Sequence, residues 1–250
     1  MKKLKYLFPR PARAWVKRRI RVAKVSLAPD HVRDWSVLRR VQPYRSDFGI
    51  GRGQCIDRYY IERFLASHRD AIHGQVAEVG DAQYTAQFGA DRVAQSHVLD
   101  LNDQNDQRTL TIDLTRTEQV PEGLFDCIIA TQVLLFIRDY SSAIRSLYKM
   151  LKNGGVLLVT LPGISPLVVG PMVDGVGEDL WRFTDRSASC EFGAVFGESH
   201  IEVCTYGNVL SATAFLHGLV SEELTTRELE HHDPSYQVLI GVRATKQPVP

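Results

Sequence analysis

The sequence predicts an α/β protein built on a parallel, doubly wound sheet with helices on both faces. Short apolar segments typical of strands alternate with helical patterns along most of the chain. The segment Val156–Leu161 is continuously apolar, as a central strand buried on both faces requires. The chain has 250 residues, of which 44 % are hydrophobic and 24 % charged, so one sizeable core is expected and bulk disorder is excluded.

The expected elements follow one another in a regular order. An irregular linker, Ser46–Gly53, precedes a helix over Arg58–His68 that Asp57 is placed to cap. A second amphipathic helix over Ser141–Leu151 is expected to stop at Asn153–Gly155. Seven segments have the composition of strands: Gln75–Val79, Ser96–Leu101, Leu110–Leu114, Leu124–Ala130, Val156–Leu161, Ile201–Thr205 and Tyr236–Arg243.

The net charge of +1 conceals a basic arm joined to an acidic domain. Residues 1–40 hold 13 basic and two acidic side chains, whereas residues 41–250 hold 17 basic and 27 acidic ones. A helix from about Ala12 to Ser26 would be cationic with one apolar side, which is typical of a helix at a membrane surface. A solvated tail, or a helix docked on the protein's own acidic surface, is the alternative. The acidic domain disfavours nucleic-acid binding, because it would repel phosphate.

The positions of the cysteines and histidines do not favour disulfide bonds or a metal site. Four cysteines lie far apart without paired spacing, which disfavours a disulfide framework or a zinc site and fits a reducing cytosol. His97 and His217 lie in apolar patterns and are expected to be structural, and His231–Asp233 is expected in an exposed loop. No secretory signal or apolar run of about 18 residues is present, so a cytoplasmic location is expected.

Polar side chains stand where four of the expected strands end, and ligands of open α/β sheets bind beyond those ends. Asp100 lies about 20 residues after the first turn, the spacing at which an acid holds the hydroxyls of a ribose. Asp113 is placed to accept from an adenine amino group, and Gly80 lets the backbone approach a ligand closely. The residues at these ends are Glu78, Gly80, Asp81, Asp100, Asp113, Thr131 and Gln132.

The first turn indicates which adenosyl ligand to expect. It lacks G-x-G-x-x-G and carries carboxylates, which would repel a pyrophosphate. S-adenosylmethionine has no phosphate and carries an ammonium and a sulfonium, so the turn favours it over a dinucleotide.

The segment Gly163–Asp179 is glycine-rich and apolar, and is expected to cover a pocket as a flexible lid. Next to it, Trp181 can stack on a sugar face and Arg182 can hold a hydroxyl, phosphate or carboxylate. Asp179 or Glu178 can serve as a general base. In the alternative interpretation, Trp181 caps the sheet as a core residue and Arg182 pairs with an internal acid.

These motifs resemble those of class I S-adenosylmethionine-dependent methyltransferases over about residues 55–245. The resemblance rests on Val76–Asp81, His97–Asp100, Thr111–Leu114, Phe125–Gln132 and Leu151–Thr160. It implies a Rossmann-like, seven-stranded sheet with the last strand antiparallel. It further implies a methionine side at Glu78, Gly80 and Asp81, and a ribose at Asp100 and Leu101. The adenine would lie at Asp113 and Leu114, and the reactive methyl beside Thr131 and Gln132.

More narrowly, the chain is similar to bacterial methyltransferase-like proteins found beside or fused to glycosyltransferases of surface-polysaccharide pathways. Asp57–Tyr60, Pro162–Ile164, Trp181–Thr184 and Tyr206–Leu210 carry this likeness. It implies O-methylation of a saccharide or glycolipid at the cytoplasmic membrane face, with Arg58, Tyr59 and Trp181 binding the acceptor and a glycosyltransferase as a possible partner. The expected parts are a basic arm, residues 1–45, and a methyltransferase-like domain, residues 46–250.

The sequence can also be compared with two other functions. A catalytically silent scaffold in a glycan-assembly complex would keep the fold without the reaction. A glycosyltransferase would need a metal-binding Asp-x-Asp, which the sequence lacks.

Overall fold

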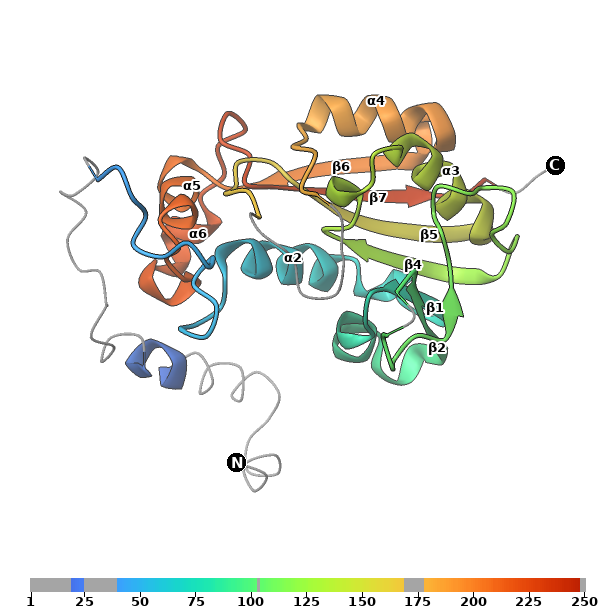
Figure 1. Cartoon of the computed structure of the whole chain (residues 1–250), viewed down its shortest axis with the longest axis horizontal. Coiled ribbons are helices and arrows are strands. Elements are labelled where there is room, and N and C mark those ends of the chain that lie inside the picture. The colour runs from blue at the N-terminus through green and yellow to red at the C-terminus, as the bar shows by residue number, and fades with distance from the viewer. Residues whose placement is uncertain (1–18, 25–39, 103, 169–177, 248–250) are drawn as a thin grey trace, which may run out of the picture.

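The computed structural model describes residues 19–24, 40–102, 104–168 and 178–247. They form one seven-stranded sheet with helices on both faces, in the strand order β3-β2-β1-β4-β5-β7-β6 (Figure 1). All neighbouring pairs are parallel except those of β7, which runs antiparallel to β5 and β6. The predicted fold is therefore confirmed. The strands are β1 Gly74–Val79, β2 Val93–Asp100, β3 Leu110–Thr111, β4 Phe125–Thr131, β5 Leu151–Pro162, β6 Ile201–Tyr206 and β7 Leu239–Thr245.

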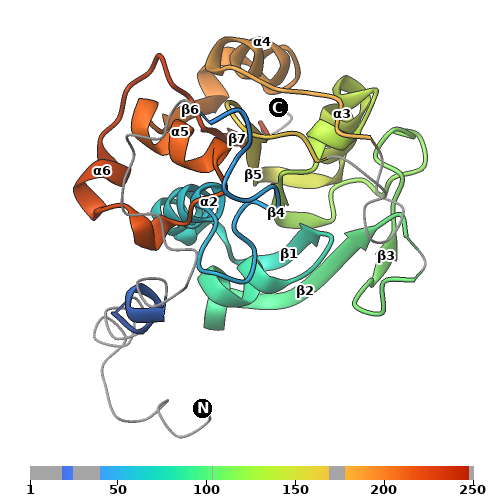
Figure 2. The same ribbon diagram turned by 60° about the vertical axis from the view of Figure 1, so that its left-hand side comes forward.

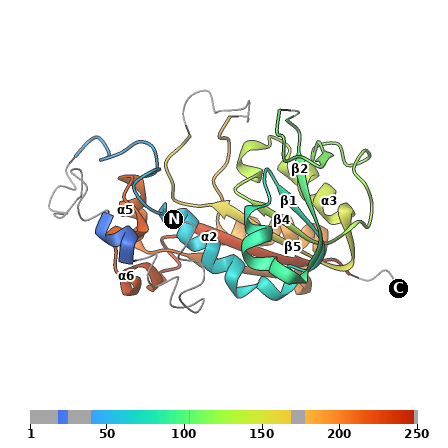
Figure 3. The ribbon, with the colours of Figure 1, turned by 90° about the horizontal axis from the view of Figure 1, so that it is seen from below.

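The helices cover the sheet in two layers. In Figure 1, α3 (Tyr140–Met150) and α4 (Asp185–Phe196) lie above the sheet, and α2 (Ile56–Ser67) lies below it. Figure 3 shows α2 from its own side, in front of the strands. The short helices α5 (Val209–Leu216) and α6 (Thr226–Glu230) stand beside α2 (Figure 2).

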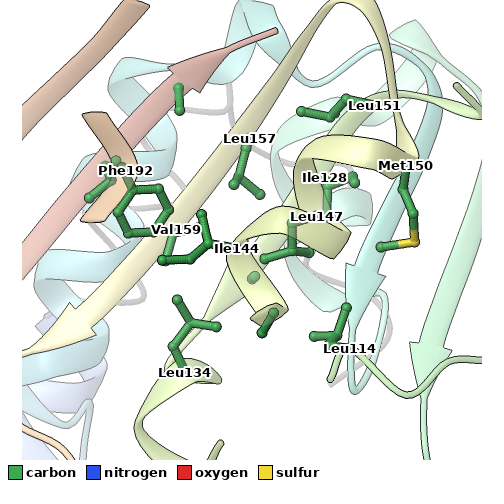
Figure 4. Packing of buried hydrophobic residues seen from close by; sticks show 14 of the residues in the cluster. Leu114, Ile128, Leu134, Ile144, Leu147, Met150, Leu151, Leu157, Val159 and Phe192 are labelled. Atoms are coloured by element: carbon green, nitrogen blue, oxygen red, sulfur yellow. The ribbon is translucent and has the colours of Figure 1, made fainter. Parts of the chain in front are cut away.

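Successive residues of β4 belong to two different cores, because side chains alternate across a strand. Ile128 belongs to one cluster with Ile144 and Leu147 of α3 and Phe192 of α4, whose members Figure 4 shows. Ile129 belongs to the opposite cluster with residues of α2 and α5. A strand buried on both faces explains the continuous apolar segments in the sequence.

The start of α2 differs from the prediction. The helix begins at Ile56 with Cys55 as its N-cap residue and without a side-chain cap, so the expectation that Asp57 caps it is wrong. Cys55 is held in extended conformation by an antiparallel bridge to Val220, and the chain turns helical directly after it. Asp57 consequently lies inside the first turn, where its Oδ1 accepts from Arg58 N at 2.8 Å.

Two strand ends also differ from the sequence-based boundaries. The expected turn at Asn153–Gly155 is part of the long strand β5, where Gly154 has a φ of 78°. The strand expected to reach Leu114 ends at Thr111, because the Asp113 carboxylate accepts from Thr115 N at 2.9 Å and turns the chain.

Part of the basic arm is visible. Arg19–Lys24 are helical, drawn dark blue in Figure 1, and the rest of the expected helix lies outside the described residues. Arg21 Nη1 is 3.5 Å from Glu222 Oε1, so this helix contacts an acid of the domain. Within the described ranges, none of the helices is long and apolar enough to cross a membrane.

Candidate functional site

Two adjoining cavities lie beyond the carboxyl ends of β1 and β4, where the strand order reverses and ligands of such sheets bind. We call the first, of 570 Å³, the polar cleft. The second, of 380 Å³, is the apolar pocket. Four residues line both cavities and form their junction: Ile50, Cys55, Arg58 and Thr131.

The loop after β1 forms one wall of the polar cleft, and the Glu78 side chain accepts hydrogen bonds from the backbone of this loop. The Glu78 carboxylate is buried and accepts from Tyr84 N at 3.1 Å and from Thr85 N at 2.7 Å. Burial raises the pKa of Glu78 to about 7. Asp81, Gln83 and Tyr84 line the cleft, while Glu78 positions the loop that carries them.

Gly80 stands at the turn with a φ of +94°, and a Cβ built on it meets no atom within 4 Å. The space beside this backbone is therefore open for the close approach of a ligand. Asn105, which sequence reasoning missed, joins the ends of β1 and β2. Its Nδ2 donates to Gly80 O at 2.7 Å and to Asp100 Oδ2 at 2.6 Å. No sequence pattern distinguishes Asn105 from an ordinary loop asparagine.

Asp100 and Asp113 follow along the same edge of the sheet. Asp100 ends β2 half-buried, and its Oδ1 accepts from Asn102 N at 2.9 Å. Asp113 accepts from Thr115 Oγ1 at 2.7 Å and pairs with Arg116 at 3.2 Å. The Thr115 hydrogen bond, with the help of Arg116, lowers the pKa of Asp113. Leu101 is exposed and Leu114 is buried in the core.

The end of β4 delivers Thr131 and Gln132 to the cavities. Thr131 belongs to the junction, and Gln132 lines the apolar pocket. Gln132 has a φ of 54°, and its N–H donates to Thr160 O at 3.0 Å. A left-handed conformation is costly for a side chain of this kind, and such residues cluster at ligand sites.

Asp179 and Arg182 form a clasp at the edge of the apolar pocket. Arg182 donates through Nη1 to Asp179 Oδ1 and through Nη2 to Oδ2 at 2.8 Å. Val168 N also donates to Oδ2, at 2.9 Å, and Arg182 Nη2 reaches Pro166 O at 2.7 Å. Burial alone would raise the pKa of Asp179, but the bonds from Arg182 and Val168 hold it below the ordinary value. Arg182 is thus paired with an internal acid, and residues 169–177 of the expected lid lie outside the described part of the chain.

Trp181 and Tyr59 face away from the two cavities. The Trp181 indole donates to Ile137 O at 3.0 Å and packs edge-on against Tyr140 at 5.3 Å. Tyr59 lines a separate small pocket with residues of β6 and α6, although its neighbour Arg58 lies at the junction. Tyr59 points about 100° away from Arg58 around the axis of α2 and reaches the separate pocket. The structure brings Arg58 to the site and places Tyr59 and Trp181 elsewhere.

Asp57 is a second residue that sequence reasoning missed, since it was assigned to a helix cap. It lines the apolar pocket together with Cys55 and Arg58. Burial raises the pKa of its carboxyl, against the opposing influence of Arg58.

Three of the described histidines contact other side chains of the fold. His97 Nε2 contacts Gln75 Oε1 at 3.0 Å, and burial lowers the pKa of His97. His217 packs against Tyr44, and His232 Nε2 contacts Thr205 Oγ1 at 2.7 Å. Over the described residues, no group of three or more His, Cys, Asp or Glu side chains could hold a metal.

Comparison with known proteins identifies the family to which this chain belongs. The family model of a methyltransferase domain matches residues 47–196, from the linker through α4. Among curated proteins, a probable polyketide synthase of Dictyostelium discoideum is 25 % identical over 108 residues, which are 41 % of this chain and 4 % of that protein. The chain thus spans a small fraction of this relative's length.

Solved structures share the fold. The [4+2]-cyclase SpnF has a TM-score of 0.50 at 15 % identity, covering 80 % of this chain and 85 % of its own. A SAM-dependent methyltransferase from Archaeoglobus fulgidus has a TM-score of 0.49 at 10 % identity, with 78 % and 96 % covered. The N-methyltransferase NodS from Bradyrhizobium japonicum, solved with S-adenosylhomocysteine, has 0.47 at 12 %, with 92 % and 98 % covered.

Proposed function

Since the chain belongs to the methyltransferase-domain family, we propose that it transfers a methyl group from S-adenosylmethionine to an oxygen of a saccharide or glycolipid. S-adenosylmethionine is the cofactor, and it supplies an electrophilic methyl on a sulfonium. One observation carries the proposal: a polar cleft and an apolar pocket meet at Thr131 and Arg58, so a cofactor and an acceptor can touch there.

Residues of the polar cleft and of the sheet edge beside it fit this cofactor. The open space beside Gly80 admits a ligand against the backbone, and Asp81 offers a carboxylate to the ammonium group. Asp100, next along the sheet edge, is in our proposal the ribose acceptor, with Leu101 beside it. Asp113 and Leu114 would follow at the adenine, and Thr131 and Gln132 would flank the methyl.

Calorimetry with S-adenosylmethionine tests the cofactor part. Removing a carboxylate that accepts two ribose hydroxyls should cost about 2–3 kcal/mol, so we expect Asp100→Ala to weaken binding at least tenfold. Asp70→Asn is the matched control, because Asp70 is a solvent-exposed acid of the short helix after α2. An unchanged affinity of Asp100→Ala would contradict the ribose assignment. No detectable binding at millimolar cofactor would reject the enzyme and favour a silent scaffold in a glycan-assembly complex.

The saccharide part of the proposal is supported by the resemblance to proteins of surface-polysaccharide pathways, which also suggests a glycosyltransferase partner. The apolar pocket supports a glycolipid over a free sugar, because most of its lining is hydrocarbon. We further propose that the basic arm brings the enzyme to the cytoplasmic face of the membrane, where such an acceptor resides.

Vesicle co-sedimentation tests the arm. The full chain should bind vesicles containing phosphatidylglycerol and should bind them less at high salt, since basic residues near an anionic surface contribute about 1 kcal/mol each. Pure phosphatidylcholine vesicles are the control. Equal binding to anionic vesicles with and without residues 1–40 would refute the membrane role.

A further inference from the structure

The apolar pocket contains one carboxylate that the clasp and the polar cleft leave unused, that of Asp57. We propose that Asp57 is the catalytic base that takes the proton from the acceptor hydroxyl, and that the acceptor is amphipathic, with an apolar body in the apolar pocket. This inference rests on the proposed methyl transfer and adds to it the proton acceptor and the class of acceptor.

The position of Asp57 places its carboxyl beside the junction. It lies in the first turn of α2, two residues after Cys55 and directly before Arg58, and both of these neighbours line both cavities. Thr131 reaches the same junction from the end of β4. A methyl group passing from the polar cleft to the apolar pocket must cross this junction, so an acceptor oxygen waiting there lies within the pocket that Asp57 lines.

Asp57 has a free oxygen where Asp179 has none. Its Oδ1 accepts from Arg58 N at 2.8 Å. Among the described residues, the structure shows no ion pair to Asp57 and no hydrogen bond to its Oδ2. Both oxygens of Asp179, by contrast, are occupied by Arg182 and Val168. The geometry therefore selects Asp57 over Asp179, one of the two residues, with Glu178, that the sequence offers as the base.

The groups around Asp57 strengthen its carboxylate as a proton acceptor. Burial raises its pKa, and Arg58 provides the nearby positive charge. Cys55 faces it as a neutral thiol, because burial and the Asp57 charge raise the thiol pKa to about 11. Tyr84, whose hydroxyl lies 3.4 Å from Arg58 Nη1, is also neutral, since burial raises its pKa. Across the pocket, the Asp179–Arg182 pair carries no net charge.

The reaction balances with these groups. The acceptor oxygen attacks the methyl carbon and forms a C–O bond, while the C–S bond breaks and its electron pair stays on sulfur. The sulfonium becomes a neutral thioether, the acceptor becomes a methyl ether, and the hydroxyl proton moves to the Asp57 carboxylate. One positive and one negative charge are thereby lost together, which a weakly polar pocket favours.

The lining of the apolar pocket indicates the acceptor class. Nine of its lining residues are phenylalanine, isoleucine, leucine, proline or valine. Besides Asp57 and the clasp, its polar side chains are those of Arg58, Thr131, Gln132 and Ser165. A sugar ring buried there would leave several hydroxyls without partners, at a cost of about 1–3 kcal/mol each. An apolar body carrying a hydroxyl avoids this cost. The apolar lining residues are Phe48, Ile50, Leu135, Phe136, Pro162, Pro166, Val168, Phe215 and Val238.

The experiment measures methyl ether formation by the full chain loaded with S-adenosylmethionine, using mass spectrometry. Octyl β-glucoside below its micelle concentration is the amphipathic probe, and methyl β-glucoside is the same sugar without the apolar body. General-base catalysis contributes about 10²–10⁴-fold, so Asp57→Asn should lose about that factor in kcat while its affinity for S-adenosylmethionine stays within about twofold. Asp70→Asn should behave as the wild type.

Two further readouts separate a base from a structural role. The wild-type rate should rise with pH to a plateau, because the base acts only when deprotonated, and Asp57→Asn should lose this rise. Asp57→Glu should recover part of the rate, since it restores a carboxylate in a longer side chain. If Asp57→Asn does not fold, the wild-type pH profile and Asp57→Glu decide the question.

Several results would overturn the inference while leaving cofactor binding intact. They are a rate of Asp57→Asn within threefold of the wild type, equal use of the two glucosides, and no methylation of either probe by protein that binds S-adenosylmethionine. If the wild type does not bind S-adenosylmethionine, the proposed function itself is rejected.

Discussion

Replacing Glu78 by Gln should change how the stability of the protein depends on pH. In the folded state the pKa of Glu78 is about 7, raised by burial from an ordinary value of 4.5. The folded protein therefore binds more protons than the unfolded chain between these two values. The resulting stabilisation is complete below pH 4.5 and is lost as the pH rises through 7.

The magnitude follows from the size of the shift. Each pKa unit is worth about 1.4 kcal/mol, so the full effect is about 3 kcal/mol, of which about 2.5 kcal/mol falls between pH 5 and pH 8. Glutamine cannot ionise and lacks this dependence. It also keeps one oxygen for the two N–H donors of Tyr84 and Thr85, so it should lose about one hydrogen bond at every pH.

Urea unfolding at pH 5 and pH 8 measures the effect, with the wild type and Glu78→Gln compared at each pH. From pH 5 to pH 8, the wild type should lose about 2.5 kcal/mol of unfolding free energy that the variant does not lose. The unfolding free energy of the variant minus that of the wild type should therefore be larger at pH 8 by this amount. Other groups titrate equally in both proteins, so their contributions cancel in the difference between the two unfolding free energies. Parallel pH profiles would refute the argument that a buried carboxyl holds the loop after β1.

Three further predictions follow. Gly80→Ala should weaken S-adenosylmethionine binding at least tenfold in calorimetry, because its Cβ would enter the open space beside β1, and an unchanged affinity would show that no ligand lies there. Asp179→Asn should lower the unfolding free energy by about 2–4 kcal/mol in urea, because Arg182 loses its charged partner, and wild-type stability would show that the pair is dispensable. Gly241→Ala places a Cβ 2.5 Å from Phe64 Cδ2, so a loss of about 1–3 kcal/mol is expected in thermal unfolding, and no loss would contradict the packing of α2 on β7.

The sheet was predictable because burial on both faces leaves a strong signature. The middle parts of β4 and β5, Cys127–Ala130 and Val156–Val159, are continuously apolar. The sequence places both ends of β1 and β4 within one residue, and it places the start of β5 five residues too late. The edge strand β3 is only two residues long, and its end depends on a side-chain turn at Asp113 that composition does not mark. The antiparallel β7 came from the family resemblance, since periodicity alone does not reveal strand direction.

The candidate site was less predictable, because it depends on the direction of individual side chains. Asp57, Arg58 and Tyr59 are consecutive, yet one lines the apolar pocket, one the junction and one a separate pocket. That division follows from where α2 begins, and the start is decided by the bridge from Cys55 to Val220, far along the chain. The contact of Asn105 with Gly80 and Asp100 likewise joins segments that only the folded sheet brings together.

The clasp of Asp179 and Arg182 also affects which changes in sequence length this fold can tolerate during evolution. Val168 and Pro166 are hydrogen-bonded to Asp179 and Arg182, so these two described stretches of the chain are held together. Doubling the length of a loop closed in this way costs about 0.6 kcal/mol. Because Val168, Asp179 and Arg182 line the apolar pocket, a change of chain length between them would lie next to the pocket and would cost the rest of the fold little stability. Acceptor preference could change in evolution here without renewed selection for stability.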